Sequence, residues 1–546
     1  MLLLQYATSG WLVATAVLSL SLYSVALVVY RLFFSPIRRF PGPRLAAATF
    51  WYEFYYDVVL GGQYTFHIAH LHEKCGPVVR INPHELHVHE FDFYNQLYTA
   101  GGRTRHKWYW ASRAFGADFS TFATERHEDH RMRRSALNPS FSTAQVRKLE
   151  PLIQSRVYSV MRRVRQFKED GSVLPLDVMF GAFSAGRLES TDLARAMTDN
   201  PNKDVITEYA FRRPGRKLEA PDFDDDFHTA CINGGKQLFL TRQFPWLLKV
   251  IRTIPPHMTL KFNPSMSSFF AMHKDIAMQV RSVLDEPSST NKAPTVFHKI
   301  LDSKIPEHEK SFNRLASDAG SLVGAATITT SWALTHAVFH LLNNPSCLKK
   351  LKTELADALT PASHDHGETI LPILEQLPYF TAVIQEALRL SVGVSTRLAR
   401  VAPDEVLTVK DSTRTEGEWK IPPSTPVSMS QQLILYDERI FPSASAFRPE
   451  RWIEDPGLIR YQVAFSRGSR ACLGKHLALA EMYLLLGGLF SSYGSPEVRM
   501  PGDLGYLELY ETDKSDIECA VDAFLPLPKV GSKGVRCRVL AWEHAK

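Results

Sequence analysis

The sequence predicts a mainly α-helical protein with a minor β-sheet, preceded by one membrane-spanning helix. Three observations lead to this fold class. The first 30 residues, Met1–Tyr30, contain no charged side chain. Beyond them, long stretches carry apolar side chains at the 3.6-residue spacing of helices, and only a few short runs alternate as half-buried strands do.

The composition excludes several classes of protein. Hydrophobic residues make up 45% and charged residues 22% of 546 residues, which is ordinary for a globular protein and excludes disorder and a fibrous architecture. Six cysteines without regular spacing exclude a disulfide scaffold and fit a reducing compartment. The formal charge of +6 is not gathered in a basic run, so we expect no nucleic-acid partner.

The N-terminal stretch is interpreted as an uncleaved anchor. Trp11–Tyr30 is almost wholly apolar, and roughly 20 apolar helical residues cross a bilayer core of about 30 Å. A secretory signal peptide, the alternative, would carry its basic residues before a shorter apolar core. Here they follow it, as Arg31, Arg38 and Arg39. The positive-inside rule then places the body in the cytosol. We predict an anchor over residues 1–34 and one catalytic domain over 35–546.

The residues after the anchor are expected to form a spacer, a hairpin and then mainly helices. Phe40-Pro41-Gly42-Pro43 is a stiff, non-helical spacer. Alternating runs at 77–81 and 85–89 predict a hairpin. Helical spacing predicts helices at 127–136, 143–168, 312–342, 345–359 and 373–391. The remainder predicts strand-like pieces at 405–410 and 425–435, a polar loop near 440–470, and a last helix from about 473 to 490.

The most informative segment is Phe465–Gly474, which reads FSRGSRACLG. Cys472 lies where a loop containing glycines gives way to an apolar-periodic helix. The helix N-terminus and nearby Arg470 both favour a thiolate there. Such a thiolate serves metal ligation or nucleophilic attack, the latter with His476 as a base one helical turn away. A buried structural cysteine is the ordinary alternative.

The pattern Phe-x-x-Gly-x-Arg-x-Cys-x-Gly resembles the heme-binding loop of the cytochrome P-450 family. The resemblance runs from Phe40 to the C-terminus. It implies that family's fold, a helical triangular prism with a small β-lobe that holds heme b between a long central helix and the cysteine-loop helix. Phe465, Arg470 and Cys472 would bind the heme, with the Cys472 thiolate as the axial ligand of the iron.

Two further segments strengthen the resemblance. Glu386-Ala387-Leu388-Arg389 is similar to the family's Glu-x-x-Arg helix. Phe447–Trp452 (FRPERW) resembles its Pro-Glu-Arg-Phe motif, with tryptophan in the last place. The resemblance implies a buried ion-pair network of Glu386, Arg389 and Arg451 that fixes the cysteine loop.

His127–Arg134 (HEDHRMRR) could be taken for a metal cluster or, more simply, for a polar helix face. The family has Trp-x-x-x-Arg here, which donates to a heme propionate. His130 stands in the place of the tryptophan and keeps a ring N–H, and Arg134 is retained. Arg400 resembles a second propionate arginine, for which Arg397 competes, and Arg470 is a third.

The family's oxygen-activating motif on the central helix is matched by Ala325–Thr329 (AATIT). By this resemblance Ala325 leaves the groove where O₂ fits, and Thr329 hydrogen-bonds the oxygen or its water. Ile328 stands where the family has an acid, and isoleucine cannot relay a proton. Proton delivery would therefore use water or another hydroxyl, that of Thr327 or Thr330.

The resemblance implies a heme-dependent monooxygenase that hydroxylates or epoxidises an apolar small molecule. Electrons would come from NADPH through a membrane-bound reductase, and the location would be the endoplasmic reticulum membrane. A cationic docking face for the reductase is expected at Arg131, Arg133, Arg467 and Lys475. The tail and the 204–211 segment look like fungal secondary-metabolism members of the trichodiene-oxygenase-like group. With the aromatic-rich 105–122 stretch, this suggests a terpenoid substrate.

Two alternative functions stay open at this point. One is a heme-thiolate isomerase or carrier without oxygen chemistry, and the other is a membrane-anchored hydrolase that uses Cys472 and His476. One segment matches no element of the family: Gly186–Lys203 is polar throughout much of its length. We interpret it as a surface loop or as translated intron sequence.

Overall fold

The computed structural model describes residues 2–99, 101–113, 119–185, 209–210, 218, 223, 226–254, 258, 266–285, 295–359, 369–411 and 417–542. Gly186–Lys203 lies outside them, as does most of the 204–211 segment. The chain forms two compact units. Unit 1 comprises Met1–Trp108 and Arg397–Ser430, and unit 2 comprises Tyr109–Thr396 and Gln431–Lys546.

Unit 1 begins with the N-terminal helix and contains most of the short strands. Its helices are α1 (Leu2–Val29), the π-helical η1 (Tyr30–Phe34), α2 (Arg44–Ala48), α3 (Trp51–Phe54), the π-helical η2 (Tyr55–Val59), α4 (Tyr64–Cys75) and α5 (Tyr94–Leu97). Its strands are β1 (Val78–Arg80), β2 (Leu86–Val88), β3 (His106–Lys107), β5 (Arg400–Val401), β6 (Leu407–Asp411), β7 (Gly417–Ile421) and β8 (Pro426–Ser428). They form a five-stranded sheet, β1-β2-β8-β5-β3, and the separate β6-β7 hairpin. The expected hairpin at 77–89 is confirmed, since β1 and β2 pair antiparallel.

The N-terminal apolar helix meets the length and hydropathy expected of a membrane span. Trp11–Phe34 has a mean hydropathy of 2.3 and none of it is buried. Among the described residues one other helix passes the same test, Phe312–Leu342, but 67% of its most apolar window is buried inside the protein. The second helix is therefore explained as a core helix, and the first is a candidate anchor.

The spacer after the N-terminal helix is packed onto the rest of unit 1. The Arg80 amide donates to the Pro41 carbonyl at 2.7 Å, and a Cβ on Gly42 would lie 2.4 Å from the Arg80 carbonyl oxygen. Only glycine fits this approach. The Arg80 guanidinium donates to the Arg31 carbonyl at 2.9 Å, and Arg31 donates to the Ala48 carbonyl at 2.8 Å. The end of the N-terminal helix is thus fastened to α2 and β1.

Unit 2 is mainly helical. Its helices include α6 (Tyr109–Ser112), α7 (His127–Leu137), α8 (Thr143–Arg147), α9 (Glu150–Asp170), α10 (Leu176–Ala185), α12 (Asp226–Gln243), α13 (Pro245–Thr253), α15 (Met266–Asp285), α16 (Val296–Leu301), α17 (Phe312–Leu342), α18 (Pro345–Ala358), α19 (Leu371–Leu374), α20 (Pro378–Ser391), α21 (Gln431–Leu435), α22 (Arg451–Glu454) and α23 (Lys475–Ser492). Its strands are β4 (Val173–Pro175), β9 (Tyr493–Gly494), β10 (Gly505–Leu509), β11 (Val521–Ala523), β12 (Leu525–Leu527) and β13 (Arg536–Leu540). They form a four-stranded sheet, β4-β13-β10-β9, and the β11-β12 hairpin.

The prediction of a mainly helical protein with a minor sheet is confirmed, and local signals explain most helix ends. Pro345 and Pro378 open α18 and α20 at positions whose N–H groups need no helical partner. Gly171, at a φ of 66°, ends α9 in the left-handed conformation. The single helix expected at 143–168 is wrong, because the chain breaks between α8 and α9. The strand expected at 425–435 is confirmed only in its first part, β8, because the second part forms the helix α21.

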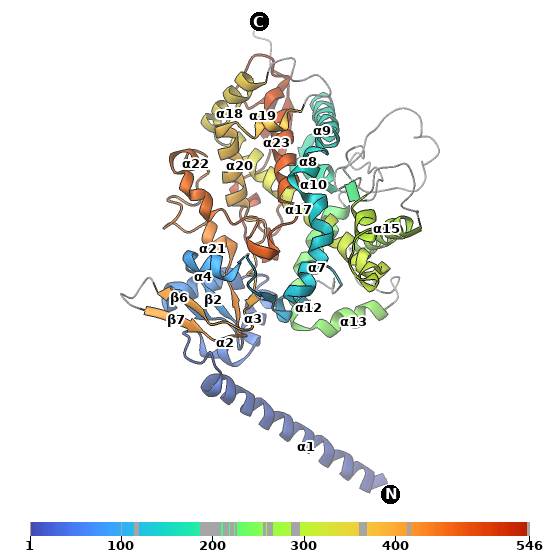
Figure 1. Ribbon diagram of the computed structural model, residues 1–546, viewed down its shortest axis with the longest axis vertical. Helices are drawn as coiled ribbons and strands as arrows, with labels where there is room; N and C mark the ends of the chain where they lie inside the picture. Colours follow the sequence, from blue (N-terminus) through green and yellow to red (C-terminus); the bar gives the residue numbers. More distant parts are fainter. Residues whose placement is uncertain are drawn as a thin grey trace. The chain divides into compact units, whose positions relative to one another are not determined.

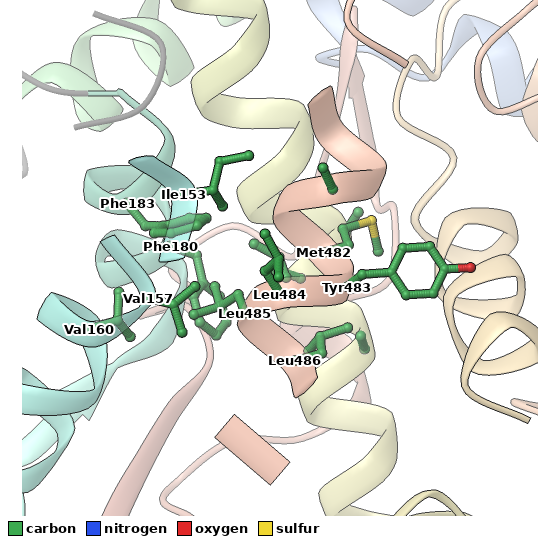
Figure 2. Packing of buried hydrophobic residues seen from close by; sticks show 14 of the residues in the cluster. Ile153, Val157, Val160, Phe180, Phe183, Met482, Tyr483, Leu484, Leu485 and Leu486 are labelled. Atoms are coloured by element: carbon green, nitrogen blue, oxygen red, sulfur yellow. The ribbon is translucent and has the colours of Figure 1, made fainter. Parts of the chain in front are cut away.

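The core of unit 2 lies around α17 and α23. The central helix α17 packs against α10, α15, α20 and α23 (Figure 1). Figure 2 shows Met482–Leu486 of α23 between the neighbouring helices, with Ile153, Val157, Val160, Phe180 and Phe183 of α9 and α10 on one side. The middle of α23 is apolar on every side, as expected for a helix buried all round. This packing fixes the helix that begins three residues after Cys472.

Candidate active site around Cys472

Cys472 lies in a tight loop that is closed by backbone hydrogen bonds. Its amide donates to the Phe465 carbonyl at 2.8 Å, and the Ala471 amide donates to the Gly468 carbonyl at 3.1 Å. Gly468, at a φ of 75°, adopts the left-handed conformation that the turn requires. The loop presents Cys472 just before α23, and its side chain is exposed.

The pKa of the Cys472 thiol is raised, chiefly by burial. The amides of Gly474 and Lys475 and the charges of Arg134 and Lys475 act in the opposite direction. The helix-start amides are the effect expected from the sequence. The surrounding protein thus desolvates the thiol, although part of the residue is open to solvent. A metal ion bound there would deprotonate the thiol.

Helix α7 brings one of the predicted cofactor residues close to the cysteine. Arg134 interacts electrostatically with Cys472 and donates to Asn138 at 2.7 Å. Burial lowers the pKa of Arg134. His130, one turn earlier on α7, is buried. No group of three or more His, Cys, Asp or Glu side chains that could hold a metal ion is found among the described residues, and HEDHRMRR lies within α7.

Arg470 is held by the segment that precedes α7. Its guanidinium donates to the carbonyls of Thr124, Glu125 and Arg126 at 2.7, 2.8 and 3.3 Å. The cysteine loop is therefore tied to the start of α7 through this side chain. Phe465 is half-buried and packs against the core of unit 2.

Arg400, a predicted propionate arginine, belongs to unit 1. It is buried in β5, donates to the Ala399 carbonyl at 3.0 Å and lies over the Tyr98 ring. Arg397, its expected competitor, is paired with Glu53 at 2.8 Å and Glu85 at 3.2 Å. Arg400 forms no ion pair within the described part of the chain. The charge of Arg397 is satisfied inside unit 1, whereas that of Arg400 is not.

The middle of α17 presents an uncovered face. Ala325 is exposed and Thr329 half-buried, although their neighbours Thr327, Ile328 and Thr330 are buried. The Thr329 hydroxyl donates to the Ala325 carbonyl at 2.8 Å. The Thr327 hydroxyl donates to the Val323 carbonyl at 2.8 Å on the buried side. Ala325 and Thr329 therefore share the open face, and Thr327 does not.

Glu386, Arg389 and Arg451 form a buried ion-pair network. Arg389 donates to both Glu386 oxygens at 2.8 and 2.9 Å, and Arg451 donates to one of them at 3.1 Å. Sequence reasoning missed a fourth member, Trp452, whose indole N–H donates to Glu386 at 2.9 Å. The sequence did contain a signal for it: Trp452 stands where the motif has phenylalanine, and a buried indole N–H needs a hydrogen-bond acceptor.

One expected docking residue is not available on the surface. Arg133 donates twice to Glu309, at 2.8 and 2.9 Å, and its side chain is only 16% exposed. The expectation that Arg133 belongs to a reductase-docking face is therefore wrong. Arg131 and Lys475 are exposed, and Arg467 is half-buried.

The residues of this site fit a heme. A thiol beside two backbone N–H groups suits a thiolate ligand of the heme iron, and the exposed Ala325 leaves this face of α17 uncovered among the described residues. Arg134 has no carboxylate partner among the described residues, which suits a propionate of a heme. Cys472 and His476 share no hydrogen bond in the part of the chain that the structure describes, so a Cys/His catalytic pair is not formed.

Comparison with known proteins gives one consistent answer. The sequence profile of the Cytochrome P450 family matches residues 41–497. The chain is 42% identical to the cytochrome P450 monooxygenase tpcC of Cochliobolus heterostrophus over 522 residues, covering 95% of each protein. It is 40% identical to astB of Talaromyces wortmannii, another cytochrome P450 monooxygenase (95% of this chain, 96% of the relative). It is also 40% identical to the tryptophan 6-hydroxylase fscE of Fusarium equiseti (95% of each).

Proposed function

Because this chain belongs to the cytochrome P450 family, we propose that Cys472 is the axial ligand of its heme and that the reaction is hydroxylation or epoxidation of an apolar small molecule. The enzyme is a heme-thiolate monooxygenase, and its relatives are fungal enzymes of secondary metabolism. When bound, the heme supplies the activation of O₂, with electrons that the family takes from NADPH through a reductase. The observation that carries the proposal is the position of Cys472 in a hydrogen-bonded loop just before α23.

The residues around the cysteine would stabilise its negative charge. The amides of Gly474 and Lys475 and the charge of Arg134 all lower the pKa of the thiol. His130, Arg134, Arg400 and Arg470 are proposed to hold the propionates. Arg470 would do so while it anchors the start of α7, because a guanidinium has five N–H donors. Glu386, Arg389 and Arg451 would support the loop from behind.

The reduced, carbon-monoxide-bound spectrum tests Cys472. The wild-type protein should give the thiolate-type Soret band, and Cys472→Ser should lose it. Cys75→Ser is the matched control, since Cys75 is a half-buried free cysteine in unit 1 and should leave the band unchanged. Folded wild-type protein that binds heme without this band would refute the assignment.

Thr329 is proposed to hold a water or oxygen atom on the open face of α17. Its hydroxyl hydrogen goes to the Ala325 carbonyl, so its lone pairs are left to accept a hydrogen bond. Ile328 supplies no acid, and the hydroxyl of Thr327 bonds on the buried side. Of the two routes expected from the sequence, water along the Ala325 face is therefore better supported than Thr327.

Measuring hydrogen peroxide released per NADPH tests this role. Thr329→Val should raise the leakage several-fold, whereas Thr327→Val, the same change on the buried side of the helix, should not. Ile328→Glu should lower the leakage. Equal leakage from the two valine variants would contradict the role of Thr329.

The substrate class is proposed from two sources that differ. The resemblance to trichodiene-oxygenase-like enzymes suggests a terpenoid. Two relatives are named as hydroxylases of tryptophan and N-acetyltryptophan, which suggests a flat aromatic substrate. Trichodiene, tryptophan and N-acetyltryptophan, each supplied with reductase and NADPH, separate the two classes by the product formed.

The N-terminal helix is proposed to anchor the enzyme in the endoplasmic reticulum membrane as a single span, with residues 35–546 in the cytosol. The support is its exposed apolar surface and the basic residues that follow it. Deleting residues 1–34 should move the protein from the membrane pellet to the supernatant. Protease treatment of sealed microsomes should digest the remaining domain, and its protection would overturn the orientation.

A further inference from the structure

A buried ionic network lies where the 120–126 segment meets the first turns of α17. Asp318 pairs with Arg314 at 2.6 Å, one turn earlier on the helix. Asp318 also accepts the backbone amide of Thr121 at 2.6 Å and its hydroxyl at 3.0 Å. The Arg314 guanidinium donates to the Thr121 hydroxyl oxygen at 2.7 Å. Thr121 is therefore bound by both charges through its backbone and its side chain.

A second acid extends the network to α7. Glu309, in the short helix Glu307–Lys310, receives two bonds from Arg133 and one from Arg314 at 3.0 Å. Arg133 also donates to the Thr124 hydroxyl at 2.8 Å. Two acids and two arginines balance in charge, as buried ions require. Burial alone would raise the pKa of Glu309, but the bonds and charges of Arg133 and Arg314 hold it below its usual range.

The segment held by this network contacts both the cysteine loop and the β11-β12 hairpin. At Thr124–Arg126 its carbonyls bind Arg470 of the cysteine loop. At Phe122 its side chain lies edge-on against Phe524, with ring centroids 5.9 Å apart. Asp318 itself precedes Ala325 and Thr329 by seven and eleven residues, which places all three on one face of α17.

We propose that Asp318 and Arg314 are positioning residues that hold the 120–126 segment, and with it Phe122, as a wall of the substrate space above the open face of α17. The proposal rests on the monooxygenase function and deepens it. Neither side chain needs to touch the substrate, because Thr121 transmits their position to the segment. Breaking the hydrogen bonds of Thr121 should therefore weaken the affinity for a bulky ligand without changing the affinity of the heme for a small one.

The first experiment measures the segment itself and needs no bound heme. Arg126 is exposed at the end of the segment, so trypsin should cut there when the segment opens. Asp318→Ala removes both bonds to Thr121 and should raise the cleavage rate about tenfold, the change that corresponds to about 1.4 kcal/mol of easier opening. Glu307→Ala is the matched control, because that carboxylate is 87% exposed and pairs with Lys310 at 2.7 Å.

The second experiment measures the wall of the substrate space. Imidazole and 4-phenylimidazole both bind heme iron, but only the second is large enough to need the wall. Titrations followed at the Soret band should give Asp318→Ala a Kd for 4-phenylimidazole about tenfold higher, with imidazole binding unchanged. A variant equal to wild type in both cleavage rate and 4-phenylimidazole affinity would overturn the proposal.

A double variant separates positioning from a purely structural role. Arg314→Leu with Asp318→Leu removes both charges together, and such replacements are often neutral or stabilising. It should melt at a higher temperature than Asp318→Ala, which leaves Arg314 without its acid, and still show fast cleavage after Arg126, because Thr121 has lost its acceptor. Wild-type cleavage in the double variant would refute the proposal even if Asp318→Ala fails to fold. Wild-type protein without a thiolate-type spectrum would instead refute the monooxygenase function, while the cleavage result would stand.

Discussion

Lys352 holds the far end of the cysteine-loop helix, and its loss should be costly. Its buried ammonium on α18 donates to the carbonyls of Phe490 and Tyr493 at 2.6 and 2.9 Å, where α23 ends. It also pairs with Asp503 at 2.8 Å, and the two side chains are 2% and 1% exposed. A cation at this position satisfies carbonyls that the helix leaves open and complements its dipole.

Lys352→Met keeps most of the side-chain volume but leaves the Asp503 carboxylate buried without its cation. Removing one partner of a buried pair costs about 3–5 kcal/mol. An unfolding entropy of about 2.1 cal/mol/K per residue, over 546 residues, is about 1.1 kcal/mol/K. The melting temperature should therefore fall by about 3–5 °C.

Differential scanning calorimetry of matched variants checks this value. Lys350→Met is the control two residues away, because Lys350 pairs with Glu450 at 2.7 Å on the surface, where its side chain is 55% exposed. Such a pair contributes about 0–1 kcal/mol, so that variant should melt within about 1 °C of wild type. Adding Asp503→Asn to Lys352→Met should recover part of the loss. Equal melting of the two lysine variants, or no recovery in the double variant, would refute the reasoning.

Two further predictions concern pH. Burial raises the pKa of Glu481, on α23, to about 8, so the folded protein holds a proton that the unfolded chain releases above about 4.5. The free energy of unfolding, relative to that of Glu481→Gln, should therefore fall by about 1.4 kcal/mol per pH unit between about pH 5 and pH 8 and then level off. Melting temperatures of the two proteins that change in parallel over this range would contradict the prediction. In unit 1, burial and the neighbouring His72 and His89 hold the pKa of His87 well below 6.5. The contribution of neutral His87 to stability should therefore be present above pH 6.5 and lost as the pH falls. The melting temperature of the wild type should drop more than that of His87→Leu between pH 7.5 and pH 5.5, and equal drops would show that His87 does not cause the loss.

The sequence was enough to find elements whose signals are local. The 31-residue apolar pattern of α17 ends at Asn343-Asn344-Pro345, and its predicted bounds agree with the structure. The break between α8 and α9 was missed because apolar periodicity continues across it. The run that contains β8 and α21 is apolar throughout much of its length, and periodicity does not separate a short strand from a short helix there.

The candidate site shows the same division. The spacing around Cys472 and the Glu-x-x-Arg helix are local patterns, so the motif residues could be named in advance. Thr121 and Asp318 are 197 positions apart, and no local pattern indicates that they bind. Burial, which raises the pKa of Cys472, is likewise a property of the folded chain, whereas the opposing helix-start amides could be expected from the local sequence.

The fastening of Arg31 and Pro41 to Arg80 has a mechanical consequence. In the proposed membrane-anchored enzyme, a loose linker after the anchor would let unit 1 rotate freely beneath the membrane. The hydrogen bonds that join the end of the N-terminal helix and the Gly42 turn to β1 would oppose such rotation. A change in bilayer thickness that tilts the proposed span would then turn unit 1 with it, so the surrounding lipid would set the orientation of unit 1 relative to the membrane surface.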